Sequence, residues 1–113
     1  MSASGVQPFE AIAIVGLGLI GGSVARDVRR LGLAQQILGY DNNEEYYKEI
    51  KSGKLVDYLS DAPDKKLAQA ELVLLAVPVK SFVEILPGIF SNISSTAILT
   101  DTGSVKSPLL KMR

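Results

Sequence analysis

The sequence predicts an α/β domain with a doubly wound parallel sheet whose strands take the order 3-2-1-4-5. Three observations lead to this fold class. The chain has 113 residues, of which 47% are hydrophobic, so it can bury one globular core. Short apolar runs alternate with helical patterns along its length, which is typical of β-α-β units. The right-handed crossovers of such units then place later strands on both sides of the first.

The first strand and helix are the clearest part of the pattern. Residues Glu10–Val15 (EAIAIV) form a short apolar run that ends at a glycine, as a buried parallel strand does. In the next segment apolar residues recur at spacings of four, four and three, which predicts one helical face made of Ile20, Val24, Val28 and Leu31. Gly32 is expected to close this helix.

The second unit follows the same plan. Gln36–Tyr40 (QILGY) predicts a strand, and Glu44–Ser52 predicts a helix that ends at Gly53. The residues before this helix can all act as N-caps: Asp41, Asn42 and Asn43.

The remaining segments continue the alternation to the end of the chain. Residues 1–8 are expected to be disordered, and residues 9–113 to form the domain. In chain order, the expected elements are a weak strand at Leu55–Leu59, a short helix at Pro63–Ala70, a buried strand at Leu72–Val77, a helix at Ser81–Phe90 that Pro87-Gly88 can interrupt, a strand at Thr96–Thr100 and a helix that starts at Ser107-Pro108.

A glycine-rich turn joins the first strand to the first helix. Residues Gly16–Gly21 (GLGLIG) fit the G-x-G-x-x-G pattern of dinucleotide binding. Gly16 permits the tight turn, Gly18 lets the backbone approach a pyrophosphate, and Gly21 lets the helix pack closely on the strand. The helix also directs its free N–H groups toward the phosphates. A glycine turn without any ligand is the alternative interpretation.

An acidic residue stands at the distance that the pattern requires. Asp41 follows Gly21 by 20 residues, at the end of the second strand, where a carboxylate can accept hydrogen bonds from both ribose hydroxyls. It would repel the 2′-phosphate of NADP, and its neighbours Asn42 and Asn43 supply no positive charge. We therefore expect NAD to be preferred over NADP. The alternative is that Asp41 is only a helix cap.

Two further segments belong at the same edge of the sheet, because ligands bind beyond the carboxyl ends of parallel strands. They are Ala76–Lys80 and Asp101–Ser107. With these the chain resembles the nucleotide-binding half of the prephenate and arogenate dehydrogenases of tyrosine biosynthesis. The stretches VGLGLIGGSVA, GYD, AELVLLAVPV and ILTDTGSVKS carry the resemblance, which covers Ala11 to Ser107.

The resemblance implies a Rossmann-type domain, an NAD cofactor and an oxidative decarboxylation in which hydride passes from the ring alcohol carbon to the nicotinamide. It implies that the dinucleotide is held by Gly16, Gly18, Leu19, Ile20 and Gly21, with Asp41 and Asn42 at the adenosine ribose and Ala76, Val77 and Pro78 along the cofactor. Ser104 matches the family serine near the reacting hydroxyl, where it can orient the substrate or the base; a turn or capping role is the alternative.

The sequence departs from that family in what it lacks. The family removes the alcohol proton with a histidine that follows a sixth strand, whereas this chain has no histidine. The resemblance also implies a helical second domain, which carries most of the dimer contact and which we do not expect within these 113 residues. We therefore expect a truncated piece of a homodimeric enzyme, which binds NAD but is inactive alone. The strand at Thr96–Thr100 would then be an exposed edge, and we expect either self-association there or an edge covered by the chain's own C-terminal helix.

Composition excludes several other classes. Twelve basic and twelve acidic residues balance, which argues against a nucleic-acid partner. The absence of Cys and His removes the commonest metal ligands, so no metal site is expected. No signal peptide or membrane-spanning run is present, which predicts a cytoplasmic protein with a small-molecule substrate.

Two rival readings use the same glycine turn. One is a ligand-sensing module such as the nucleotide-binding regulatory domains of potassium channels, which perform no chemistry. The other is a different two-domain dehydrogenase of the hydroxyacid or 6-phosphogluconate type, which usually reads G-L-G-x-M-G where this chain has Ile20.

Overall fold

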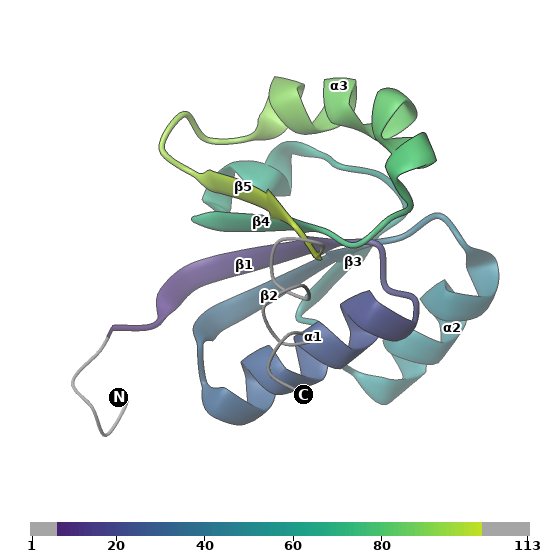
Figure 1. Ribbon diagram of the computed structural model, residues 1–113. Coiled ribbons are helices and arrows are strands. Elements are labelled where there is room, and N and C mark those ends of the chain that lie inside the picture. The colour runs from purple at the N-terminus through teal and green to yellow at the C-terminus, as the bar shows by residue number, and fades with distance from the viewer. Residues whose placement is uncertain (1–6, 103–113) are drawn as a thin grey trace, which may run out of the picture.

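A computed structural model describes residues 7–102 and contains one five-stranded parallel sheet (Figure 1). Its order, β3-β2-β1-β4-β5, confirms the predicted topology. The strands are β1 (Phe9–Val15), β2 (Ala34–Tyr40), β3 (Tyr58–Ser60), β4 (Leu72–Leu75) and β5 (Ile98–Asp101). All four neighbouring pairs run parallel.

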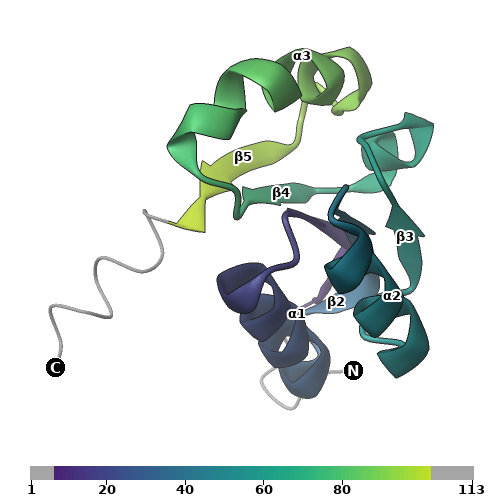
Figure 2. The same ribbon diagram turned by 90° about the vertical axis from the view of Figure 1, so that its right-hand side faces the viewer.

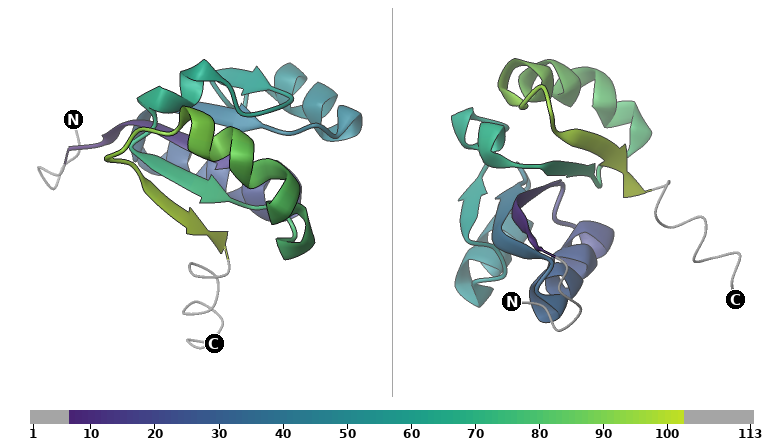
Figure 3. Two further views of the ribbon diagram at one scale, coloured as in Figure 1. Left: turned by 90° about the horizontal axis from the view of Figure 1, so that it is seen from above. Right: turned by 90° about the vertical axis from the view of Figure 1, so that its left-hand side faces the viewer.

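Helices cover both faces of the sheet. On one face α1 and α2 lie side by side, and on the other α3 lies over the β4–β5 half (Figures 2 and 3). Their bounds are α1 (Leu19–Leu31), α2 (Glu44–Gly53) and α3 (Phe82–Asn92), and two short 3₁₀ helices complete the set, η1 (Lys65–Gln69) and η2 (Val79–Ser81).

The central strand β1 is buried on both sides, which explains why its sequence is continuously apolar. Its odd-numbered residues from Ala11 to Val15 pack in one cluster with Leu67 of η1 and Ile89 of α3. Ile12 and Ile14 face the opposite cluster, formed with α1 and α2. This alternation follows from the two-residue period of a strand.

The buried face of α1 differs from the predicted one. Val28 is buried, but Ile20 and Leu31 are 39% and 54% exposed. The residues that α1 buries are Gly21, Gly22, Ala25 and Val28. The face is rotated because the helix packs on the sheet through its glycines, and this close approach turns Ile20 outward.

Several predicted boundaries were wrong. The last residue of β4 is Leu75, not Val77, and β5 covers Ile98–Asp101 instead of Thr96–Thr100. The predicted helix at Pro63–Ala70 is only the 3₁₀ turn η1, and α3 continues through Pro87 without interruption. The expected disorder of residues 1–6 and the helix at Ser107-Pro108 lie outside the described residues; Gln7 and Pro8 precede β1.

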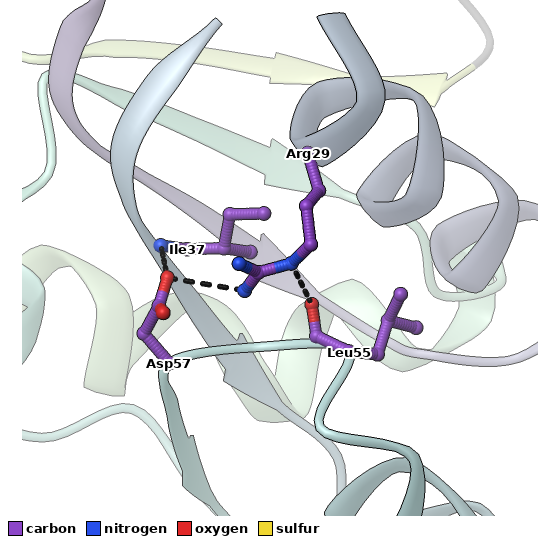
Figure 4. Close-up of polar contacts among 4 residues, drawn as sticks. All are labelled: Arg29, Ile37, Leu55 and Asp57. Carbon is purple, nitrogen blue, oxygen red and sulfur yellow. Dashed lines mark hydrogen bonds and ion pairs between the residues drawn. The ribbon is translucent and has the colours of Figure 1, made fainter. Parts of the chain in front are cut away.

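The weak strand predicted at Leu55–Leu59 begins later, at Tyr58, and at Asp57 a side-chain oxygen takes the place of a backbone carbonyl as the acceptor. Asp57 Oδ2 accepts a 2.7 Å hydrogen bond from the Ile37 N–H, and the Asp57 N–H donates to the Ile37 carbonyl. Arg29 of α1 donates to the Leu55 carbonyl and pairs with Asp57 at 3.2 Å (Figure 4). This cluster ties α1 to the β2–β3 half of the sheet.

Candidate functional site

A cleft of about 680 Å³ opens beyond the carboxyl ends of β1, β2 and β4. The position is the one that the sheet topology predicts, where the strand order reverses on either side of β1. Seven of the residues proposed from the sequence line this cleft: Gly16, Gly18, Asp41, Asn42, Ala76, Val77 and Pro78.

Two glycines of the turn are required by the fold itself. Gly16 has φ +100°, and a Cβ there would lie 2.8 Å from the Ala76 carbonyl oxygen. A Cβ on Gly21 would lie 1.8 Å from the Gly16 carbonyl oxygen. Neither position can accept a side chain without moving the backbone, so the turn holds α1 tightly against the end of β1.

Gly18 has a different environment. Its φ of −68° suits any residue, and the Cβ direction points at the ring of Tyr46, 3.3 Å from Cε2. Gly18 is also the N-cap of α1 and supplies no capping side chain. The N–H groups of Leu19, Ile20 and Gly21 therefore have no partner within the helix. Leu19 is 88% exposed, and none of these three predicted residues lines the cleft.

Asp41 holds the glycine turn in place. Its Oδ2 accepts a 2.6 Å hydrogen bond from the Leu17 N–H, and its Oδ1 accepts a 2.8 Å bond from the Asn43 N–H. Each carboxylate oxygen keeps a further lone pair for a ligand. Asp41 is not the cap of α2, because that role belongs to Asn43, whose side chain accepts from the Glu45 and Tyr46 N–H groups.

The charge of the cleft is negative. Acidic side chains line it at Asp41, Asp61 and Glu84, and no Lys or Arg does so within residues 7–102. A ligand with phosphate groups must therefore be held by backbone N–H groups and neutral donors. A further phosphate close to Asp41 would be repelled.

The wall of the cleft opposite the glycine turn was not predicted from the sequence. It consists of residues 61–63 after β3 and of one face of η2 and α3, Ser81, Glu84, Ile85 and Gly88. The spacings of three, one and three in this set mark a single helical face, a signal that could have found them. A Cβ on Gly88 would lie 3.8 Å from Pro63, which shows how closely the two parts of the wall approach.

A cluster of two tyrosines and an aspartate lies next to that wall, because Asp64 directly follows Pro63. The Tyr40 and Tyr58 hydroxyls both donate to the Asp64 carboxylate, which also caps η1 through the Lys66 N–H. Burial disfavours the charged carboxylate, but these hydrogen bonds outweigh it and lower the pKa of Asp64. Burial, followed by the nearby Asp64 charge, raises the pKa of Tyr40, and the hydrogen bond to Asp64 raises that of Tyr58.

The remaining candidate is not placed. Ser104 lies outside the described residues. Over residues 7–102 no group of three or more acidic, Cys or His side chains is arranged to hold a metal ion. Over the same part of the chain, no helix has the length and apolar character needed to cross a membrane.

Comparison with protein families finds one matching model, described as the prephenate dehydrogenase nucleotide-binding domain, over residues 24–112. The cyclohexadienyl dehydrogenase of Zymomonas mobilis is 34% identical over 91% of this chain and 35% of its own length. A potassium uptake protein, Ktr system protein A of Bacillus subtilis, is 31% identical over 78% of the chain and 36% of its own length. The chain thus spans about a third of the length of these relatives.

Solved structures agree with the sequence comparison. The prephenate dehydrogenase of A. aeolicus, in complex with hydroxyphenyl propionate and NAD⁺, has a TM-score of 0.75 and 31% identity, over 84% of this chain and 34% of that one. The arogenate dehydrogenase of Synechocystis has a TM-score of 0.71 and 32% identity, over 80% and 32%.

Proposed function

The chain belongs to the family of prephenate dehydrogenase nucleotide-binding domains, and from this premise we propose that it binds NAD in the cleft at the glycine turn. It would serve as the cofactor domain of an enzyme that oxidatively decarboxylates prephenate or arogenate. When bound, the nicotinamide supplies the hydride acceptor. The residues of this chain bind and orient the dinucleotide: Gly16, Gly18, Leu19, Ile20 and Gly21 at the diphosphate, Asp41 and Asn42 at the adenosine, and Ala76, Val77 and Pro78 beyond it.

One observation carries this proposal: the Asp41 carboxylate is bonded to the glycine turn itself, through the Leu17 N–H. The acid and the uncapped start of α1 therefore face one cleft at a fixed separation. A dinucleotide fits this arrangement, because its ribose hydroxyls can donate to the remaining lone pairs of Asp41 while its phosphates meet the N–H groups of α1.

Titration of the chain with NAD by calorimetry tests the proposal. Asp41→Ala should weaken binding at least tenfold, and Gly18→Val should abolish it. The φ of Gly18 suits valine and only the Tyr46 ring has to give way, so this variant should keep its fold by circular dichroism. Unchanged NAD binding by a folded Gly18→Val variant would contradict the proposed site.

The same cleft supports a preference for NAD over NADP. Asp41, Asp61 and Glu84 would repel the 2′-phosphate, and none of the described lining residues is basic. NAD should bind at least tenfold more tightly than NADP at low ionic strength, with the difference reduced in Asp41→Asn. Tighter binding of NADP to the unmodified chain would show that the preference is the reverse.

We also propose that the 113-residue chain, tested alone, binds NAD without turnover. It contains no histidine, and a general base is typically worth about 10²–10⁴ in rate. Ser104 would then only orient the substrate hydroxyl or the base. The absorbance of NADH at saturating prephenate, and then arogenate, should stay flat; steady NADH production with either substrate would refute this.

The outer edge of β5 is proposed as a site of self-association. Ile98 is 58% exposed, and among residues 7–102 no strand pairs with this edge. In the longer enzyme, a helical domain would carry the dimer contact. Sedimentation of the chain should show concentration-dependent association that Ile98→Lys reduces. A monomer at all concentrations would contradict this proposal.

A regulatory, ligand-sensing module is the second candidate function, because the similarity to the Ktr system protein covers 78% of the chain. Such a module would need the glycine turn and Asp41 but no catalytic residue. Ligand preference separates the two candidates: a mononucleotide such as ADP that binds more tightly than NAD would favour the sensor.

A further inference from the structure

Tyr46 has no assigned role, and we propose that its hydroxyl donates a hydrogen bond to the diphosphate of the bound dinucleotide. This inference rests on the proposed NAD-binding function and adds a residue to that site. Tyr46 is 40% exposed and lines the cleft together with Gly18 and Asp41.

The position of the ring is the first argument. Tyr46 lies in the first turn of α2, and its N–H donates to the capping side chain of Asn43. From there the ring reaches α1: a Cβ built on Gly18 would lie 3.3 Å from Tyr46 Cε2 and 3.7 Å from its hydroxyl oxygen. Gly18 is the residue at which the motif brings a diphosphate against the backbone. The Tyr46 hydroxyl is therefore within reach of a group bound there.

The availability of the hydroxyl is the second argument. The hydroxyls of Tyr40 and Tyr58 both donate to Asp64. The Tyr46 hydroxyl bonds to no other group among residues 7–102. It is thus a donor at the edge of the cleft that is free to turn toward a ligand.

The charge of the site is the third argument. A dinucleotide carries two negative charges on its diphosphate, while the described lining of the cleft offers three acidic side chains and no cation. The N–H groups of α1 supply part of the compensation. Neutral side-chain donors can supply more, and of the hydroxyls that line the cleft Tyr40 is already bonded to Asp64 and Ser81 lies on η2 at the opposite wall.

Calorimetric titration with NAD, ADP and adenosine tests this assignment. Tyr46→Phe keeps the ring against Gly18 and removes only the hydroxyl. We expect it to weaken NAD and ADP binding about tenfold, as for a hydrogen bond to a charged group, and to leave adenosine binding unchanged. The ratio of ADP to adenosine affinity within one variant does not depend on the folded fraction. Tyr47→Phe is the matched control, because Tyr47 is the next residue of α2 but does not line the cleft.

Each other outcome has a distinct meaning. An unchanged ADP-to-adenosine ratio in Tyr46→Phe would overturn the inference and leave the proposed function intact. Equal weakening of all three ligands would place the contact at the adenosine and overturn the assignment to the diphosphate. Failure of the unmodified chain to bind NAD would overturn the proposed function and this inference with it.

Discussion

At the scale of single residues, three glycines satisfy one motif for different physical reasons. Gly16 needs a positive φ, Gly21 has no room for a methyl group, and Gly18 has ordinary backbone geometry but faces the cleft. Only Gly18 can therefore accept a side chain without moving the backbone, by a small shift of the Tyr46 ring. Ligand binding and stability can be separated within a single loop.

The neighbouring glycines of α1 give a direct test of this difference. Gly21→Ala should lower the free energy of unfolding by more than about 2 kcal/mol, because its Cβ would collide with the Gly16 carbonyl. Gly22→Ala is the control: its Cβ would meet only the Leu17 carbonyl oxygen at 3.5 Å, and alanine favours the helix by about 1 kcal/mol. Urea unfolding measures both, and equal effects would contradict the packing argument.

At the scale of elements, the residue preference of a helix end predicts the last residue of α1 but not that of α2. Gly32 ends α1 in the left-handed conformation, as predicted. In α2 the predicted glycine stop at Gly53 was wrong, because Gly53 is the last helical residue and Lys54 takes the left-handed position with φ 53°. The chain turns at Lys54, and the Leu55 carbonyl then accepts a hydrogen bond from Arg29. This tertiary contact outweighs the preference for glycine at a left-handed position.

Lys54 is therefore a strained position with a simple remedy. Lys54→Gly should raise the free energy of unfolding by about 0.5–1 kcal/mol, because the left-handed conformation penalises a side chain. The reverse change in α1, Gly32→Ala, should lower it by about 1 kcal/mol, since a Cβ there meets no atom within 4 Å and only the backbone conformation is penalised. Chemical denaturation of the two variants should show shifts of opposite sign.

At the scale of the whole molecule, the Tyr40–Tyr58–Asp64 cluster connects the sheet to the wall of the cleft. It joins β2, β3 and the start of η1. Because the pKa of Asp64 is lowered in the folded state, its contribution is present above the unfolded value of about 4 and is lost as the pH falls through the folded value. The raised pKa values of the tyrosines act oppositely: their contribution is present below about pH 10 and is lost above it.

Asp64→Asn should therefore flatten the acid limb of the stability profile. At pH 7 the variant should be less stable by about 1–3 kcal/mol, and the difference should shrink as the pH falls below 4. Asp61→Asn is the control, an exposed aspartate three residues earlier whose side chain has no hydrogen-bond partner within residues 7–102. Urea midpoints between pH 3 and 8 give the profile; a difference that stays constant down to pH 3 would exclude this role for Asp64.

The strand order, the glycine turn and the acid beside it could all be predicted from the amino-acid sequence. These depend on local information. The apolar run of β1 reports burial on both faces, and right-handed crossovers reduce the possible orders to a few, of which 3-2-1-4-5 is the one typical of the dinucleotide-binding glycine turn. The turn and Asp41 end strands that share one sheet edge, so their meeting follows from topology alone.

The side-chain contacts between different elements could not be predicted in this way. The rotation of α1, the start of β3 at Tyr58, the contact of Tyr46 with Gly18 and the wall formed by α3 all depend on how far one element turns or slides against another. A helical pattern gives the spacing of residues on a face but not the neighbour which that face approaches. The distance and angle between two packed elements depend on the side chains of both, so they cannot be read from one segment. In this chain the glycines of α1 allow the helix to approach the sheet closely.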